Sequence, residues 1–467
     1  MSRPVRTGVF VVLVLLVAAD TWYSFLQHYH QPLDGDVAWN LVPAEEVRPV
    51  LQDPLGLQTW MEGRIYPNPN RFFCHWSFRA YLLHSPRFLQ HFTDPVTSVY
   101  LAAGIARLLT QVLLLLLLAR AVTGGWQIQK LPFWAALAIL VPFFQANGYR
   151  SHLGIVDPSV TYTFFYALPA AALVALLLPF IDRLYHGRKD LSVIRMMGYG
   201  VLAVVVTLSG PLNPGAIGAL SAVALLAGVT YRNGWDPQHR RYFILWGWGA
   251  GLAVYSLYVG SYNSLTITNA LPLAERYAVL PEGVFRQFTG KLASPVLFAG
   301  LGLNYFLLRR SAGGNRIEKA YAYVVLFSLL YILLLPLGGY REYRPFILRY
   351  DTVLPVTLAL VGLYTLGSLH LLRRYVGRAR WSYALLPAAV AAIFTFADEP
   401  GWEHRDCEEA SLRYLATTTQ DTVALTADCP VIGWGRFAVP AESEENNRLL
   451  QLWGISERPV RYYHQEQ

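Results

Sequence analysis

The stretch Leu33-Asp34-Gly35-Asp36-Val37-Ala38-Trp39 follows the first long apolar run of the chain and opens its first long polar segment, residues 27–95. It places two carboxylates two residues apart on a glycine-containing turn. Such a pair can bind a divalent cation together, or one carboxylate can shift the pKa of the other. The alternative is a solvated Asp-Gly turn, which is common where a helix passes into a loop. The surroundings of the motif decide between these interpretations.

The composition indicates a membrane protein with several spans. Of the 467 residues, 54% are hydrophobic and only 15% are charged, whereas soluble proteins have about 25% charged residues. Apolar runs of roughly 17–22 residues can each cross about 30 Å of hydrocarbon. The first run ends in Asp20-Thr21-Trp22-Tyr23 without a cleavage signal, so we interpret it as a retained helix. We predict an all-α polytopic domain with about eleven transmembrane helices. The predicted spans are residues 8–26, 96–119, 132–147, 160–181, 194–211, 214–231, 242–260, 293–308, 320–337, 352–371 and 382–397.

The charge distribution predicts the orientation of the chain. Six short segments carry half of the 38 lysine and arginine residues but few of the 30 acidic residues. They alternate with acidic or neutral segments, so the positive-inside rule places them in the cytoplasm. We therefore expect a multi-pass protein of the plasma (inner) membrane with a cytoplasmic N-terminus and an extracytoplasmic C-terminus. The net charge of +8 is dispersed over many loops, so nucleic acid is not an expected partner. The basic segments are residues 2–6, 120–130, 182–195, 232–241, 309–319 and 373–380.

The first outer segment, residues 27–95, is too long to be a mere connector. Pro43-Ala44-Glu45-Glu46 is typical of a helix start, with proline in the first turn and acids at the positive end of the dipole. The stretch Arg71–Leu83 is aromatic on most faces with spaced arginines, which predicts an interfacial helix in the headgroup region. A second short interfacial helix is predicted around Leu273–Leu280.

We divide the chain into a transmembrane domain, residues 1–397, and a small extracytoplasmic α/β tail, residues 398–467. The tail has a helical pattern at Glu408–Leu415, a strand pattern at Thr422–Thr426 and a second helical pattern at Glu442–Trp453. All three cysteines, Cys74, Cys407 and Cys429, lie in outer segments. In an oxidising compartment Cys407 and Cys429 can form a disulfide, and two free thiols are the alternative.

The densest outer segment is Tyr340-Arg341-Glu342-Tyr343-Arg344-Pro345-Phe346-Ile347-Leu348-Arg349-Tyr350-Asp351. Arginine binds phosphate through two parallel hydrogen bonds, and tyrosine is common at headgroup depth. Because outer loops are normally poor in arginine, we predict a binding site for a lipid phosphate here. Ordinary interface anchoring with Arg–Glu pairing is the alternative. The candidate residues are Tyr340, Arg341, Glu342, Arg344 and Arg349.

Other polar residues are further candidates for the site. Arg107 falls inside a predicted span and either pairs with Asp20 or extends to the interface. Asp157, before Pro158, is either a second acid of the site or a helix cap. His28 and His30 lie just upstream of the Asp-x-Asp motif, but no histidine pair has the spacing of a helical zinc site. They are therefore either substrate contacts or interfacial side chains.

This arrangement resembles the GT-C superfamily of membrane glycosyltransferases. Its members have a similar number of spans, a large first extracytoplasmic loop with interfacial helices, and an acidic motif just after the first helix. Some also carry a soluble outer C-terminal region. The matching pieces here are Asp34-Gly35-Asp36, the aromatic stretch Arg71–Leu83 and the tail from Asp398. No WWDYG-type motif of the oligosaccharyltransferases occurs, and no particular family within the superfamily is assigned.

The resemblance implies a mechanism. A polyprenyl-phosphate-linked sugar, held among membrane lipids, would place its phosphate against Arg341, Arg344 and Arg349. Asp34 or Asp36 would take the proton from a hydroxyl of a lipid or glycan acceptor, and attack at the anomeric carbon would expel the lipid phosphate with inversion. Some members of the superfamily need a divalent metal ion and others do not. Mg²⁺ or Mn²⁺ bound by the two aspartates therefore stays an alternative, and no other cofactor is expected.

Two other classes of function remain open at the level of sequence. One is a non-enzymatic membrane protein, either a lipid or solute transporter or a scaffold of an envelope complex. The other is a polysaccharide polymerase or ligase that uses lipid-linked sugars. No nucleotide-binding motif is present, and apart from Arg107 the spans are almost free of charge. A transporter should carry charged or broken helices near the midplane, so the pattern favours an enzyme at the outer surface.

Overall fold

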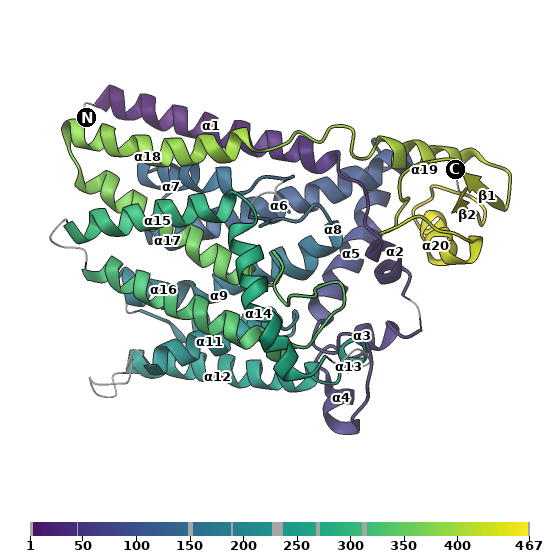
Figure 1. The fold of residues 1–467 in the computed structure, drawn as a ribbon, viewed down its shortest axis with the longest axis horizontal. Coiled ribbons are helices and arrows are strands. Elements are labelled where there is room, and N and C mark those ends of the chain that lie inside the picture. Colours follow the sequence, from purple (N-terminus) through teal and green to yellow (C-terminus); the bar gives the residue numbers. More distant parts are fainter. Residues whose placement is uncertain are drawn as a thin grey trace.

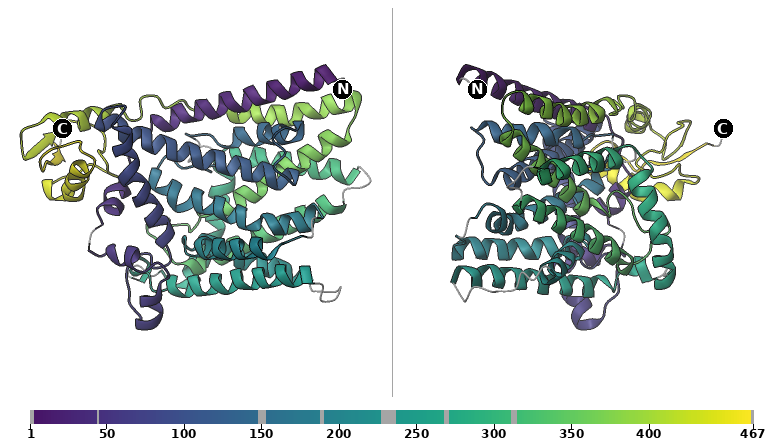
Figure 2. Two further views of the ribbon diagram at one scale, coloured as in Figure 1. Left: turned by 180° about the vertical axis from the view of Figure 1, so that it is seen from behind. Right: turned by 60° about the vertical axis from the view of Figure 1, so that its left-hand side comes forward.

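The long helices of the protein lie side by side, with the two ends of the chain at opposite ends of the bundle (Figures 1 and 2). The computed structural model describes residues 3–43, 45–147, 153–187, 190–226, 237–267, 271–310 and 315–465. Residue 2, Ala44 and parts of the predicted loops 147–158, 182–195, 232–241 and 309–319 lie outside the described residues. The helices of the bundle, with the short turns that continue them, are α1 (Arg3–Tyr29), α6 (Pro95–Thr123), α7 (Leu131–Leu140) with η1 (Val141–Phe143), α8 (Val160–Tyr162) with η2 (Thr163–Ala167) and α9 (Leu168–Tyr185), α10 (Val193–Thr207), α11 (Leu212–Leu226), α12 (Pro237–Gly260), α15 (Ala293–Arg310), α16 (Asn315–Leu334) with η3 (Leu335–Gly338), α17 (Leu354–Arg374) and α18 (Gly377–Phe396).

These helices define a multi-pass membrane protein. Within the described ranges, seven helices are long and apolar enough to cross a membrane, or up to nine if each of two bent pairs is one span. The predicted count of about eleven is therefore not confirmed, although each predicted span overlaps a helix. The difference lies in the short helices. Helix α7 has 10 residues, and α10 and α11 have 15 each and meet at a bend of 119°. A helix of 15 residues is only about 22 Å long, less than the hydrocarbon thickness of about 30 Å.

The centre of the bundle is formed by α17, the α8–α9 helix and α6, whose apolar stretches are 78%, 67% and 61% buried. Phe133 of α7 and Val361 of α17 are fully buried in the same apolar cluster as Leu114 of α6. By contrast, only 11% of the corresponding stretch of α1 is buried. A helix that is apolar all round and largely exposed in the protein requires an apolar surrounding, which agrees with a position facing lipid.

Short helices gather at the end of the bundle where α1 ends (Figure 1). They are α2 (Asp36–Leu41), α3 (Arg48–Gln52), α4 (Leu57–Glu62), α5 (Phe72–Leu89), α13 (Ser264–Ile267) and α14 (Leu273–Thr289). The helix predicted to start at Pro43 begins only at Arg48, because turns occupy residues 45–47. Helix α5 extends beyond the predicted Arg71–Leu83 and buries Cys74, Phe78 and Leu82. Helix α14 is also longer than predicted and meets α15 at 80°.

The C-terminal tail contains α19 (Asp406–Thr417), β1 (Thr422–Leu425), η4 (Pro440–Ser443), α20 (Glu444–Leu452) and β2 (Arg461–His464). Strands β1 and β2 pair in parallel, with Thr422 opposite Arg461. The sequence pattern predicted three of these segments but not β2, whose four residues are too few for a clear alternation. A disulfide joins Cys407 to Cys429. The tail shares one hydrophobic cluster with the end of the bundle where α1 ends, in which Trp453 packs with residues of α2, α5 and α6.

Candidate functional site

Asp34 is buried, and its carboxylate accepts three hydrogen bonds from protein donors. The residue is 5% exposed. Its Oδ1 accepts a hydrogen bond from the Asp36 amide at 3.1 Å, and its Oδ2 accepts from the Ser159 hydroxyl at 2.8 Å and the Thr161 amide at 3.1 Å. Ser159 is the N-cap of α8, so Asp34 fastens the loop after α1 to the helix that continues into α9. Three of its roughly four acceptor positions are occupied by protein donors.

Asp36, the first residue of α2, has a different environment. It is only partly buried. Burial and the charge of Asp34 raise the pKa of Asp36 to about 6, although a hydrogen bond from the Trp434 side chain and the charges of Arg349 and Arg71 lower it. A general base is most effective when its pKa lies near the working pH. The geometry therefore separates the two aspartates, and Asp36 is the candidate base.

Asp157 lies in the same group of charges. Its Oδ1 accepts a hydrogen bond from the Ser159 amide at 2.8 Å, while its Oδ2 is buried and has no hydrogen-bond partner among the described residues. Burial raises the pKa of Asp157 to about 8, against the Ser159 hydrogen bond and with a contribution from the charge of Asp351. Both predicted roles therefore apply, because one oxygen caps the turn before α8 while the other belongs to the site. The raised pKa favours the protonated carboxyl group, which can donate a hydrogen bond.

Two tyrosines at the N-terminal end of the α8–α9 helix support two arginines. The rings of Tyr162 and Tyr166 are 5.3 Å apart, and Tyr166 lies in the π turn η2. The Arg349 guanidinium lies 4.9 Å from the Tyr162 ring. Arg344 donates a hydrogen bond of 2.7 Å to the Tyr166 hydroxyl. Single π turns inside α-helices are frequent at functional sites.

Asp351 holds both arginines in place. This residue is 3% exposed and accepts hydrogen bonds from Arg344 at 2.8 Å and from Arg349 Nε at 3.0 Å. Burial alone would raise the pKa of Asp351, but the two arginines hold it below its ordinary value. The loop between them reverses at Ile347, which has φ +67°, a strained conformation for a β-branched residue. The side chains of Arg344 and Arg349 are 12% and 23% exposed, so Arg349 is the more accessible guanidinium.

The other predicted residues of this segment have different positions. Arg341 donates to the Leu265 carbonyl at 2.9 Å and lies in electrostatic range of Arg71 and Arg344. Tyr340 packs against the apolar cluster around Leu280 and Val353. Glu342 is exposed. The structure therefore brings Arg341 to the edge of the site but does not bring Tyr340 or Glu342 to the carboxylates.

Arg71 and Trp434 are site residues that the sequence did not single out. The Arg71 guanidinium lies 6.0 Å from the Tyr166 ring, and its Nε is buried without a hydrogen-bond partner in the described part of the chain. The available signal was an arginine directly after the turn Tyr66-Pro67-Asn68-Pro69-Asn70, at the start of an aromatic helix. Trp434 stands between Gly433 and Gly435, which is a weak signal for a close approach of two backbones.

Arg107 is fully buried in α6, so it does not extend to the interface. It also does not pair with Asp20, which corrects the prediction. Its Nη1 donates to the His28 carbonyl at 2.9 Å, and the acidic charges that act on it include Asp34 and Glu408. Asp20 precedes His28 by about 12 Å along α1, which explains why it cannot reach Arg107. Arg107 therefore compensates the buried acids behind the site.

The two histidines before the motif have other contacts. The His28 ring is hydrogen-bonded to Gln111 at 2.9 Å inside the bundle. The His30 ring packs edge-on against Trp402 at 5.6 Å. The structure does not bring either imidazole to Asp36.

The predicted metal ion has no matching set of ligands. Among the described residues, no group of three or more His, Cys, Asp or Glu side chains is arranged to hold an ion. Asp34 already accepts hydrogen bonds from three protein donors, and Trp434 packs against Gly35 beside Asp36. This pair therefore does not fit Mg²⁺ or Mn²⁺ as it stands, and no step below is assigned to a metal.

Comparisons with known proteins add a similar structure but no family. No protein-family model matches the sequence, and no curated protein matches it. The oligosaccharyltransferase of Archaeoglobus fulgidus, solved in complex with Zn and sulfate, is similar with 12% identity and a TM-score of 0.41. The match covers 94% of this chain and 61% of that one, so this chain spans about three fifths of its length. At this TM-score the likeness carries no argument, so the function proposed below rests on the geometry of the site.

Proposed function

We propose that the protein is an integral membrane glycosyltransferase that moves a sugar from a polyprenyl-phosphate donor to an acceptor on the extracytoplasmic face. The observation that carries this proposal is a partly buried carboxylate, Asp36, in electrostatic range of the guanidinium groups of Arg349 and Arg71, at the end of a membrane bundle. A transfer reaction of this kind needs a base for the acceptor and cations for the departing phosphate.

Asp36 acts as the general base. Its carboxylate takes the proton of the acceptor hydroxyl as the oxygen attacks the anomeric carbon. The bond between that carbon and the phosphate oxygen breaks, and its electron pair leaves with the lipid phosphate. Because attack and departure occur on opposite faces of the sugar, the configuration inverts. Asp34 does not touch the reacting atoms; it positions Asp36 through the Asp36 amide.

The arginines stabilise the charge that develops on the phosphate. Asp351 orients Arg344 and Arg349, and Tyr162 supports the Arg349 guanidinium from one side. Arg71 adds a third cation. The protonated Asp157 carboxyl can donate a hydrogen bond to the same phosphate, since its Oδ2 has no partner among the described residues. Preorganised donors in a site of low polarity act mainly on the transition state.

The proposal includes eleven spans, a cytoplasmic N-terminus and an extracytoplasmic tail in the plasma membrane. It is supported by the overlap of every predicted span with a helix and by the opposite positions of the two termini (Figure 2). With an odd number of spans, the two termini must lie on opposite sides of the membrane. Periplasmic alkaline phosphatase activity of a C-terminal fusion, with none for a fusion at Lys130, is the expected result.

The main test is a mass-spectrometric comparison of envelope glycans and glycolipids. It compares wild-type cells, a deletion strain, and deletion strains that carry Asp36→Asn or Glu46→Gln. Glu46 is an exposed acid of the same outer segment, so its variant is the matched control. Deletion and Asp36→Asn should lose the same sugar, while Glu46→Gln restores it at equal membrane abundance.

Two outcomes would overturn the proposal in different ways. If deletion changes no glycan, the transporter or scaffold interpretation replaces the enzyme. If Asp36→Asn restores the glycan fully, the carboxylate is an ordinary turn residue. A loss of chain length rather than of one sugar would instead indicate a polymerase or ligase acting on lipid-linked sugars.

A further inference from the structure

A loop of the C-terminal tail rests on the Asp34–Asp36 motif. A Cβ atom on Gly35 would lie 2.5 Å from the Trp434 backbone nitrogen and 2.7 Å from its Cδ1. Real side chains do not approach this closely, so only glycine between the two aspartates allows the contact. Trp434 is nevertheless 59% exposed. The loop therefore brings a large aromatic side chain to the base without burying it.

The Trp434 ring continues a row of aromatic and cationic groups. It lies 5.6 Å from the Tyr162 ring at an angle of 39°, and Tyr162 in turn contacts the Arg349 guanidinium. The Trp434 side chain is also close enough to Asp36 to lower the pKa of its carboxyl group. A ring that packs against Tyr162 and Gly35 has a defined orientation, and its exposed face is available to a ligand.

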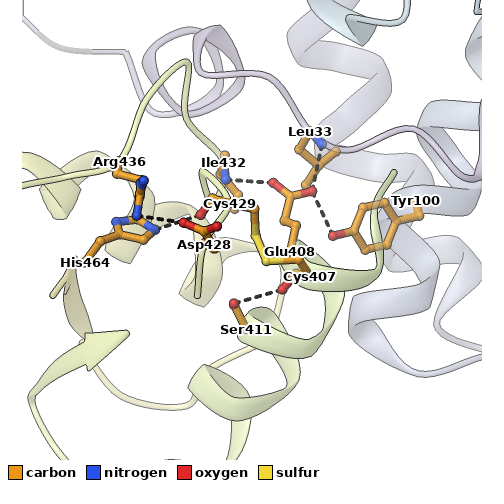
Figure 3. The surroundings of a disulfide bond; sticks show 10 residues. All are labelled: Leu33, Tyr100, Cys407, Glu408, Ser411, Asp428, Cys429, Ile432, Arg436 and His464. Atoms are coloured by element: carbon orange, nitrogen blue, oxygen red, sulfur yellow. Dashed lines mark hydrogen bonds and ion pairs between the residues drawn. A yellow bond between two sulfur atoms is a disulfide. The ribbon is translucent and has the colours of Figure 1, made fainter. Parts of the chain in front are cut away.

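The position of this loop is fixed by a carboxylate of the tail, as Figure 3 shows. Glu408 Oε2 accepts from the Leu33 amide at 2.8 Å and the Tyr100 hydroxyl at 2.9 Å, and Oε1 accepts from the Ile432 amide at 2.7 Å. One side chain thus holds the residue before Asp34 and the residue two positions before Trp434. Burial raises the pKa of Glu408 to about 7, against the hydrogen bonds from the Leu33 and Ile432 amides.

Two further constraints act on the same loop. Cys407, next to Glu408, is joined to Cys429 by the disulfide. Ile432 has φ +44°, a conformation that persists in a non-glycine residue only where the surroundings enforce it. Its carbonyl accepts a hydrogen bond from Asn446 Nδ2 at 2.9 Å. An exposed tryptophan on a loop held this firmly is preorganised, which is the condition for a binding residue.

We propose that Trp434 is a stacking platform for a sugar ring of the acceptor, so that the acceptor is a carbohydrate and the C-terminal tail forms part of its binding site. This inference rests on the proposed transferase function. It identifies the acceptor rather than the donor, because Trp434 lies against Gly35, next to Asp36, the residue that must meet the acceptor hydroxyl. The donor phosphate belongs with Arg344 and Arg349, which Asp351 holds in place.

The first test measures sugar binding without turnover. Purified full-length protein in lipid nanodiscs is mixed with methyl glycosides of glucose, galactose, mannose, N-acetylglucosamine and arabinose, and binding is read by saturation-transfer NMR. At least one glycoside should give a signal with the wild type. Trp434→Ala should weaken that signal at least about fivefold, as expected for truncation of a binding tryptophan, whereas Trp434→Phe should retain much of it.

The control is Tyr414→Ala, which removes another exposed aromatic side chain of the tail, on α19. It should leave the signal unchanged. Equal melting temperatures of the variants show that a loss reflects the missing ring. Either of two results would contradict the proposal that Trp434 binds a sugar ring. One is a Trp434→Ala signal equal to that of the wild type, and the other is no signal from any glycoside with the wild type.

Asp36→Asn separates this inference from the proposed function. If Asp36→Asn cells keep their glycan although Trp434 binds sugar, the transferase fails and a sugar-binding protein remains. If Asp36→Asn cells lose the glycan but Trp434→Ala binds sugar normally, the transferase stands and the platform is wrong.

Discussion

The two halves of the Asp34–Asp36 motif lie in unlike regions of the molecule. The inner region, around Asp34, is closed: its acceptors are satisfied by Ser159 and two backbone amides, and the buried Arg107 compensates its charge. The second region, around Asp36, is only partly buried and contains Trp434 and Arg349. Two residues of the same type, separated by one glycine, therefore have different environments. We accordingly propose that Asp34 builds the site and that Asp36 performs the chemistry.

Asp36→Asn should show the largest effect. An amide cannot accept the acceptor proton, so transfer should fall by about 10²- to 10⁴-fold, the usual contribution of a general base. Since the residue is partly exposed, membrane abundance and melting temperature should stay near wild type. The measurement is sugar transferred per amount of protein in isolated membranes. If Asp36→Asn loses the folded protein together with the activity, the proposed difference between a catalytic Asp36 and a structural Asp34 is wrong.

Asp34→Asn should act mainly on stability. The new amide group would face the Ser159 hydroxyl and the Thr161 amide, and a buried unsatisfied donor costs about 1–3 kcal/mol. We expect a lower melting temperature and lower membrane abundance, with activity per folded molecule reduced less than in Asp36→Asn. A variant that is fully stable but inactive would show that Asp34 takes part in the chemistry.

Arg349→Lys should show a smaller effect on activity. Lysine keeps the charge but loses the paired N–H donors that hold Asp351 and would bind a phosphate. We expect an about tenfold loss of transfer, seen chiefly as weaker use of the lipid donor. The control is Arg436→Lys, an exposed arginine paired with Asp428 on the tail. If Arg349→Lys and Arg436→Lys lose the same amount of transfer activity, Arg349 has no specific role in binding the donor.

The pH dependence should show the smallest effect under ordinary conditions. Because Asp36 works as a carboxylate and its pKa is raised to about 6, activity should rise with pH and reach half its plateau near pH 6. Below that pH the base is protonated and activity should fall about tenfold per unit. Initial rates in membranes between pH 5 and 8 provide the measurement. A profile flat down to pH 5 would exclude Asp36 as the titrating base.

Much of the architecture was predictable because it depends on local patterns. Apolar runs separated by charged segments placed helices at all eleven expected positions, and the tail segments around Glu408, Thr422 and Glu442 have the predicted type. The number of spans was less predictable. Helices such as α7 and α10 are too short by themselves for a full crossing, and hydropathy does not show where a helix bends.

The membership of the site was predictable only in part. Asp34, Asp36, Asp157, Arg344 and Arg349 were candidates, and all five lie in one charged group. Asp20, as the partner of Arg107, was wrong, and His28 and His30 have contacts elsewhere. Arg71 and Trp434 were missed because they reach the motif from distant parts of the chain.

The sequence by itself determined a helical membrane protein with an acidic motif at the end of its first helix, because hydrophobic length and short motifs are local properties. Only the tertiary structure shows that the two aspartates differ in their environments. The difference depends on Ser159, whose hydroxyl donates a hydrogen bond to Asp34, and on Trp434, which comes from a distant part of the chain and packs against Gly35. Hydrogen-bond saturation and burial arise from contacts between segments, and a linear pattern does not contain them.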